Sequence, residues 1–296
     1  MLRQVLFVSG TLCVLAASAA ADPLPDKTPG ADILAATTAE DWRALDPENT
    51  LYIDLERGRV VVALSERLGK PHAKRIKALA REKFYDGLSF YRVIDGFVAQ
   101  GGDLFETRKS KHAKPIKAIF EEKPPKTFEF YKMEDADGYA PQAGFVESLP
   151  VGFDPETKTA WHLHCAGAIA LGRGDEKDTA ATEFYVALQP QRYLDRNMTV
   201  FGRVVAGMEH LQALRRVAPA EKPDGDLGEK IVAMRVAADV PEAERTNFEI
   251  LRSDRPAFDA YIEARRNRPE AFFHYRPDHL DVCQFGVPVR PAPMNR

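Results

Sequence analysis

The stretch that decides the fold reads FYDGLSFYRVIDGFVAQGGD and runs from Phe84 to Asp103. Its aromatic and β-branched residues favour two short strands, and Asp95-Gly96 between them favours the tight turn of a β-hairpin. The run places one cation (Arg92), one large apolar ring (Phe97) and one neutral amide (Gln100) within nine residues. A hairpin would bring the three side chains to one surface. There the ring could bury a proline, the amide could hold a carbonyl, and the guanidinium could reach an amide nitrogen.

The first 21 residues have the features of a secretory signal peptide. Arg3 precedes an apolar stretch from Val5 to about Ala17, and small residues spaced as A-x-A follow it. We expect cleavage after Ala19 or Ala21, because the apolar stretch is short for a membrane span, which needs about 20 residues. An uncleaved membrane anchor is the alternative. The sequence therefore predicts an exported protein, periplasmic or secreted, with no membrane-inserted part once the signal is removed.

The charge of the chain is mild: 41 Lys and Arg stand against 44 Asp and Glu, a formal net charge of −3. This balance gives no reason to expect a nucleic-acid partner or a polybasic membrane-surface module. With 45% hydrophobic residues the chain can build a core, and its length suits one domain with extensions. We expect a monomer.

Two cysteines, Cys165 and Cys283, remain after signal removal. Thiols can pair in an oxidising compartment, but the sequence leaves open whether these two come close enough. His162 and His164 stand directly before Cys165, and both residue types ligate zinc. Because the neighbouring sequence supplies no obvious carboxylate or second cysteine pair, the simpler interpretation is a strand. We expect neither a metal nor a cofactor.

The remaining patterns predict mainly strands. Helices are expected over 71–83 and 207–217, and an amphipathic helix over 256–266. Charge clusters and prolines in 104–161 predict a long inserted loop. A short helix carrying Trp42 is expected over 39–45. Strands are expected at 51–55, 59–64, 166–171, 183–188, 200–205 and 230–236. This pattern predicts a mostly antiparallel barrel or sandwich without choosing between them.

The segment from Phe84 to Asp103 resembles, nearly residue for residue, the signature of cyclophilin-type peptidyl-prolyl cis-trans isomerases. Further blocks of that family follow in the family's order: GAIALGR from 167, TEFYV from 182, YLD from 193 and VFGRV from 200. The resemblance implies a mainly β fold, an eight-stranded antiparallel closed barrel capped by two α-helices. The expected map is a signal peptide (1–21), a leader (22–50), a cyclophilin-like domain (51–239) with an insertion (104–161), and a C-terminal extension (240–296).

The resemblance also implies a site. The family's catalytic arginine corresponds to Arg92 and its glutamine to Gln100. Its proline pocket and substrate-gripping rim correspond to Phe97, Val98, Leu171, Gly172, Arg173, Tyr185, Tyr193 and Leu194. Rotation about a peptide bond meets a barrier of about 18–20 kcal/mol. We expect Arg92 to lower it by binding the proline nitrogen as that nitrogen becomes pyramidal in the twisted amide.

Several positions differ from the commonest family pattern. Tyr91 replaces the usual His, Glu183 replaces Gln, and Tyr193 replaces Trp. Because Tyr193 lacks the indole N–H of that Trp, cyclosporin binding should be weaker. The other differences are Val98 for Met, Gly172 for Ala, Tyr185 for Phe and Met198 for His. Two functions follow from the sequence, both with proline-containing polypeptides as partners. One is an exported isomerase that accelerates X-Pro isomerisation while exported proteins fold, and the other is a low-turnover proline-binding chaperone or scaffold module.

Overall fold

The computed structural model describes residues 28–293. The expected signal peptide, residues 1–21, lies outside the described residues. Within residues 28–293 no helix has the length and apolar character needed to cross a membrane.

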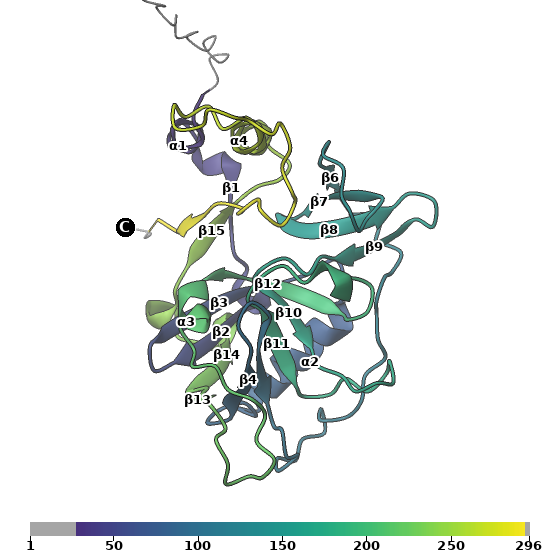
Figure 1. The fold of residues 1–296 in the computed structure, drawn as a ribbon. Coiled ribbons are helices and arrows are strands. Elements are labelled where there is room, and N and C mark those ends of the chain that lie inside the picture. Colours follow the sequence, from purple (N-terminus) through teal and green to yellow (C-terminus); the bar gives the residue numbers. More distant parts are fainter. Residues whose placement is uncertain (1–27, 294–296) are drawn as a thin grey trace, which may run out of the picture.

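A curled, nine-stranded antiparallel sheet forms the main body of the protein (Figure 1). Its strands pair in the order β13-β4-β5-β11-β10-β12-β3-β2-β14. The expected closed barrel of eight strands is therefore wrong in strand number and in closure, because the edge strands β13 and β14 follow one another along the chain instead of pairing. The strand bounds are β2 (Thr50–Leu55), β3 (Gly58–Leu64), β4 (Ser89–Val93), β5 (Val98–Gly102), β10 (Ala168–Leu171), β11 (Phe184–Ala187), β12 (Val200–Ala206), β13 (Glu229–Lys230) and β14 (Ala233–Val236).

The concave face of this sheet encloses the main hydrophobic core. Ile53, Val62, Phe90 and Phe184 are fully buried there, as apolar side chains on alternate positions of each strand must be. Helix α2 (Lys70–Arg81) covers this core with Ile76, Leu79 and Ala80. It agrees with the predicted helix within two residues. The second predicted helix is much shorter, because α3 spans only Met208–Gln212.

The insertion is not the loop that we expected. It contains an antiparallel sheet of four strands in the order β6-β7-β8-β9, namely β6 (Tyr131–Lys132), β7 (Gln142–Val146), β8 (Leu149–Asp154) and β9 (Thr159–His162). Figure 1 shows this sheet beside the main body. Pro150 sits inside β8 and Gly152 packs against the ring of Trp161. Both residue types weaken a strand pattern, which explains why the sequence did not reveal this sheet.

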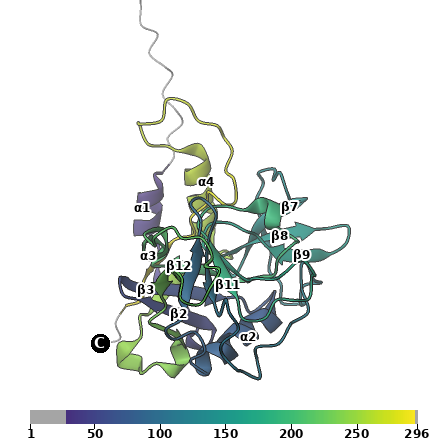
Figure 2. The ribbon, with the colours of Figure 1, turned by 60° about the horizontal axis from the view of Figure 1, so that its bottom comes forward.

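The two ends of the described chain pair with each other. Strand β15 (Phe248–Leu251) lies between β1 (Trp42–Ala44) and β16 (Val289–Pro291) in an antiparallel sheet. The short helix expected over 39–45 is thus wrong, because only 39–41 form a helical turn before Trp42 opens β1. Helix α4 (Pro256–Asn267) confirms the predicted amphipathic helix and lies beside α1 (Gly30–Ala35), as Figures 1 and 2 show.

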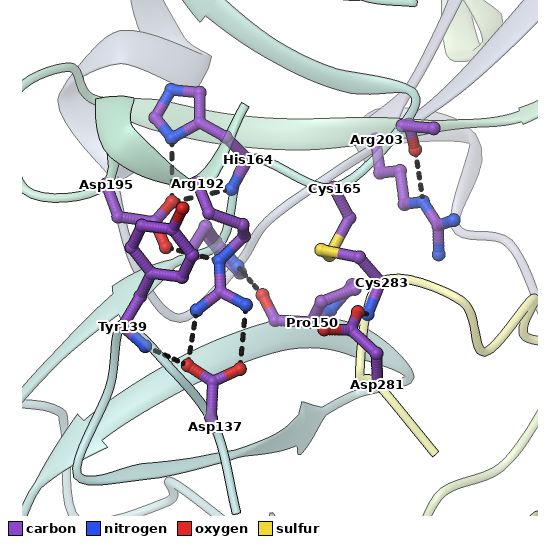
Figure 3. Close-up of a disulfide and its surroundings, with 12 residues drawn as sticks. Asp137, Tyr139, Pro150, His164, Cys165, Arg192, Asp195, Arg203, Asp281 and Cys283 are labelled. Carbon is purple, nitrogen blue, oxygen red and sulfur yellow. Dashed lines mark hydrogen bonds and ion pairs between the residues drawn. A yellow bond between two sulfur atoms is a disulfide. The ribbon is translucent and has the colours of Figure 1, made fainter. Parts of the chain in front are cut away.

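A second hydrophobic core joins the insertion to both ends. Phe145 of β7, Phe258 of α4 and Phe285 are fully buried, and their rings meet edge to face at 5.3 Å between centroids. A disulfide between Cys165 and Cys283 closes the same core (Figure 3). The pairing that the sequence left open is therefore present, and it ties the C-terminal extension to the chain just before β10.

Candidate functional site

The hairpin at Asp95-Gly96 places the expected site residues on one face of the sheet. Arg92 of β4 lies opposite Gln100 of β5, and Gln100 lies opposite Tyr185 of β11. Residues directly opposite one another in antiparallel strands point to the same face. Since Phe184 and Ala99 fill the concave core, these three side chains stand on the convex side.

Arg92 and Gln100 are in direct contact. The guanidinium of Arg92 donates to the side-chain oxygen of Gln100 over 3.1 Å and lies 5.3 Å from the centre of the Phe97 ring. The amide nitrogen of Gln100 donates to the hydroxyl of Tyr91 over 2.6 Å. The strand register shifts between Ser89 and Arg92, and such an irregularity can direct neighbouring side chains to the same place. The cation, the apolar ring and the amide therefore form one group.

An apolar cluster lies next to this group on the convex face. Val98 and Tyr185 are buried in it, and the partly exposed Phe97 and Met198 pack against it. Small residues of the neighbouring strands make its floor: Ala168, Ala170 and Ala187. Phe97 and Tyr185 thus contribute the two large rings of this apolar cluster.

The other expected site residues lie outside the group of Arg92, Phe97 and Gln100 and outside the apolar cluster. Leu171 is buried in the main core instead of the apolar cluster. Gly172 lies beside Gln100, because a Cβ added there would come 3.4 Å from the amide nitrogen. Arg173 donates to the backbone oxygens of Asn197, Gly174 and Asp175. Tyr193 is 59% exposed and Leu194 is half-buried, both in a single helical turn over Arg192–Leu194.

Glu183 adds a titratable group to the site. Its carboxylate lies against Gly102, and both oxygens are shielded from solvent. Burial raises the pKa of Glu183 to about 7, and the nearby negative charges of Asp103 and Glu106 act in the same direction. The Tyr91 hydroxyl and the backbone N–H of Asp103 oppose this rise in pKa without cancelling it. The sequence marked Glu183 only as a departure from the family pattern.

His164 has a role that the sequence did not suggest. Its ring is fully buried, with Nδ1 3.0 Å from a carboxylate oxygen of Asp195 and Nε2 3.0 Å from the hydroxyl of Tyr185. Cys165 is committed to the disulfide. The pattern of His162, His164 and Cys165 therefore does not form a ligand set. Across residues 28–293, no three His, Cys, Asp or Glu side chains come together as a metal site.

Comparisons with known proteins match the chain to one family. The family model described as cyclophilin type peptidyl-prolyl cis-trans isomerase/CLD matches residues 50–237. A probable peptidyl-prolyl cis-trans isomerase of Brucella suis biovar 1 (strain 1330) is 28% identical over 196 residues, which are 66% of this chain and 86% of the relative. Peptidyl-prolyl cis-trans isomerase B of Bacillus subtilis (strain 168) is 32% identical over 161 residues, 54% of this chain and 86% of the relative.

A solved structure shares the fold over most of the chain. The crystal structure of cyclophilin AquaCyp293 from Hirschia baltica superimposes with a TM-score of 0.71 at 24% identity. The match covers 86% of this chain and 95% of that chain. It therefore extends beyond the residues that the family model matches.

Proposed function

Because the chain belongs to the cyclophilin-type peptidyl-prolyl cis-trans isomerase family and is an isomerase by that membership, we propose that it turns over X-Pro bonds with Arg92 as the catalytic residue. The observation that carries this proposal is the contact of Arg92 with Gln100 beside the Phe97 ring. This contact holds the Arg92 cation in place next to an apolar ring. The substrates are proline-containing polypeptides.

The guanidinium acts on the twisted amide. In a planar peptide the nitrogen lone pair is delocalised, which gives the C–N bond its double-bond character. Twisting the bond localises the lone pair on the proline nitrogen, and a donor aimed there gains a hydrogen bond that the planar ground state lacks. Arg92 is always charged and presents several N–H groups from a rigid plane, so one can act on the amide while another stays on Gln100. This is stabilisation of the transition state alone, which raises kcat.

The neighbours of Arg92 hold the substrate still. Phe97, Val98 and Tyr185 bury the proline ring, so that rotation moves the chain on the other side of the bond. Gln100 has two hydrogen-bonding groups and can exchange Tyr91 for a substrate carbonyl. No bond is made or broken, and the site residues supply binding, orientation and one charged donor.

The test is the isomerisation rate of a short Ala-Pro peptide with the mature protein and with Arg92→Ala. Removing one donor of this kind typically costs about 10²–10³ in rate. Arg215→Ala is a matched control, because Arg215 is an exposed arginine whose guanidinium is ion-paired to Asp226. The proposal predicts a loss of kcat/KM in Arg92→Ala alone. Equal rates in all three proteins would contradict it.

Export to the periplasm or outside the cell is a further part of the proposal, with a role in the folding of exported proteins. The apolar stretch near the amino terminus and the Cys165–Cys283 disulfide support it, since disulfides persist in oxidising compartments. Cell fractionation followed by amino-terminal sequencing would test it. A protein beginning near Ala20 or Asp22 in the exported fraction is expected, and an intact Met1 in the cytoplasm would contradict export.

One observation favours the alternative, a proline-binding scaffold with little turnover. Phe272 and Tyr275 follow α4 and are each 81% exposed, and neighbouring exposed apolar side chains can mark an interaction site. A scaffold would lose partner binding in Phe272→Ser and keep it in Arg92→Ala. An enzyme would lose turnover in Arg92→Ala and keep it in Phe272→Ser.

A further inference from the structure

A buried chain of charged side chains runs from the insertion to the proline pocket. Arg192 lies between two carboxylates, with both terminal nitrogens on Asp137 at 2.7 and 2.8 Å and Nε on Asp195 at 2.6 Å (Figure 3). The side chains of Asp137, Arg192 and Asp195 are 4–6% exposed. Charges this deeply buried are costly unless they are paired. We name the four residues of this chain the relay: Asp137, Arg192, Asp195 and His164.

The first member of the chain belongs to the insertion. Asp137 stands between β6 and β7, and its carboxylate also accepts from the backbone N–H groups of Tyr139 and Ala140. It is therefore fixed by its own turn before it binds Arg192. The insertion in this way delivers a rigid carboxylate to the helical turn that carries Arg192.

The last member of the chain, His164, contacts the site residue Tyr185. Asp195 accepts from Arg192 and from the backbone N–H of His164. Because a carboxylate can only accept, Nδ1 of His164 carries its hydrogen toward Asp195. Nε2 of the same ring lies 3.0 Å from the Tyr185 hydroxyl, within hydrogen-bond distance. His164 thus supplies a hydrogen-bond partner for the Tyr185 hydroxyl, while the Tyr185 ring lies in the apolar cluster with Val98.

We propose that His164, held by Asp137, Arg192 and Asp195, is a positioning residue that binds the Tyr185 hydroxyl and keeps this polar group out of the proline pocket. The insertion is then part of the isomerase site without touching substrate. The proposal rests on the proposed function. It explains how a tyrosine can form part of a pocket wall that must accept an apolar ring, since a buried hydroxyl without a hydrogen-bond partner is destabilising.

A double-mutant cycle on the mature, oxidised protein tests the proposal with His164→Leu, Tyr185→Phe and both together. The measured quantities are kcat and KM for an Ala-Pro peptide. His164→Leu should raise KM about tenfold and change kcat by less than about twofold, because it affects ring binding and not the twisted amide. In the Tyr185→Phe background the same change should alter KM by less than about twofold. An equal rise in KM in both backgrounds would overturn the proposal.

Two further measurements keep the test decisive if His164→Leu does not fold. In the ¹⁵N spectrum of histidine-labelled protein, Tyr185→Phe should shift the Nε2 resonance of His164, and an unchanged resonance would overturn the proposal. Asp137→Asn can be compared with Asp135→Asn, a matched variant, because Asp135 of the insertion binds the buried Arg266 instead. Only Asp137→Asn should raise KM. A rise in both or in neither would contradict the relay.

These outcomes separate this proposal from the proposed function. An active wild type with no coupling between His164 and Tyr185 overturns the relay alone. A folded wild type without turnover overturns the isomerase site itself, and the relay with it.

Discussion

Gln100 donates a hydrogen bond from its side-chain nitrogen to the hydroxyl oxygen of Tyr91 over 2.6 Å. The side-chain oxygen of the same amide accepts from Arg92, so its two neighbours fix which way the amide faces. Tyr91 in turn lies beside the buried carboxyl of Glu183. A titratable group is thereby connected to Arg92 through two side chains.

Glu183→Gln should change how stability depends on pH. In the folded protein burial raises the pKa of Glu183 from 4.5 to about 7, so between these values the folded chain holds a proton that the unfolded chain has released. The wild type therefore loses stability as pH rises through this window, by about 3 kcal/mol in total. Glutamine does not titrate, so the variant should gain stability relative to wild type at about pH 8 but not at about pH 5.

Urea denaturation at the two pH values measures this difference. Glu221→Gln is the control, because Glu221 is exposed in a surface loop. If the difference in free energy of unfolding between Glu183→Gln and wild type is the same at both pH values, the proposed titration of Glu183 is wrong.

Removing the disulfide should destabilise the protein substantially. The bond between Cys165 and Cys283 spans 118 residues of sequence, and cross-links that close long loops restrict the unfolded chain most. We expect the variant with both cysteines changed to serine to lose about 2–5 kcal/mol of unfolding free energy. Chemical denaturation with and without a reductant measures the loss. The reductant should lower the wild type to the level of the variant and leave the variant unchanged, and a reductant-insensitive wild type would refute the bond.

The second core should be sensitive to the loss of one ring. Phe258 is fully buried and meets Tyr131, Phe145 and Phe285 edge to face. Phe258→Ala leaves a cavity, and such changes typically cost about 3–5 kcal/mol. Phe272→Ala makes the same substitution at an 81% exposed position and should change the free energy of unfolding by about 0.5 kcal/mol or less. Thermal unfolding of both variants checks this, and similar melting temperatures would show that the extension is not packed on the insertion.

Local patterns predicted the parts of the fold that are specified by neighbouring residues. The Asp95-Gly96 turn joins β4 and β5 as expected, because its preference for a tight turn is a property of two adjacent residues. Helices α2 and α4 follow from apolar spacing along a single helix. The family resemblance adds the order of strands, and Arg92, Phe97 and Gln100 meet as it implied.

Pairings between distant segments could not be predicted from local sequence patterns. Strand β1 pairs with β15 about two hundred residues later, and no local pattern at Trp42 indicates that partner. The relay was missed for a related reason. Arg192 and Asp137 look like surface charges in sequence, and only their buried contact gives them a role. His164 attracted attention as a possible ligand, while its actual partners, Asp195 and Tyr185, lie more than twenty residues away.

The most direct test of the central claim is NMR exchange spectroscopy on an Ala-Pro peptide, because one sample reports both binding and isomerisation. We expect wild-type protein to produce cis–trans exchange peaks within a second, whereas the uncatalysed reaction takes tens of seconds or more. Arg92→Ala should still bind the peptide through Phe97, Val98 and Tyr185 but lose the exchange peaks. Binding by the folded wild type without exchange, or undiminished exchange in Arg92→Ala, would contradict the claim that Arg92 catalyses the rotation.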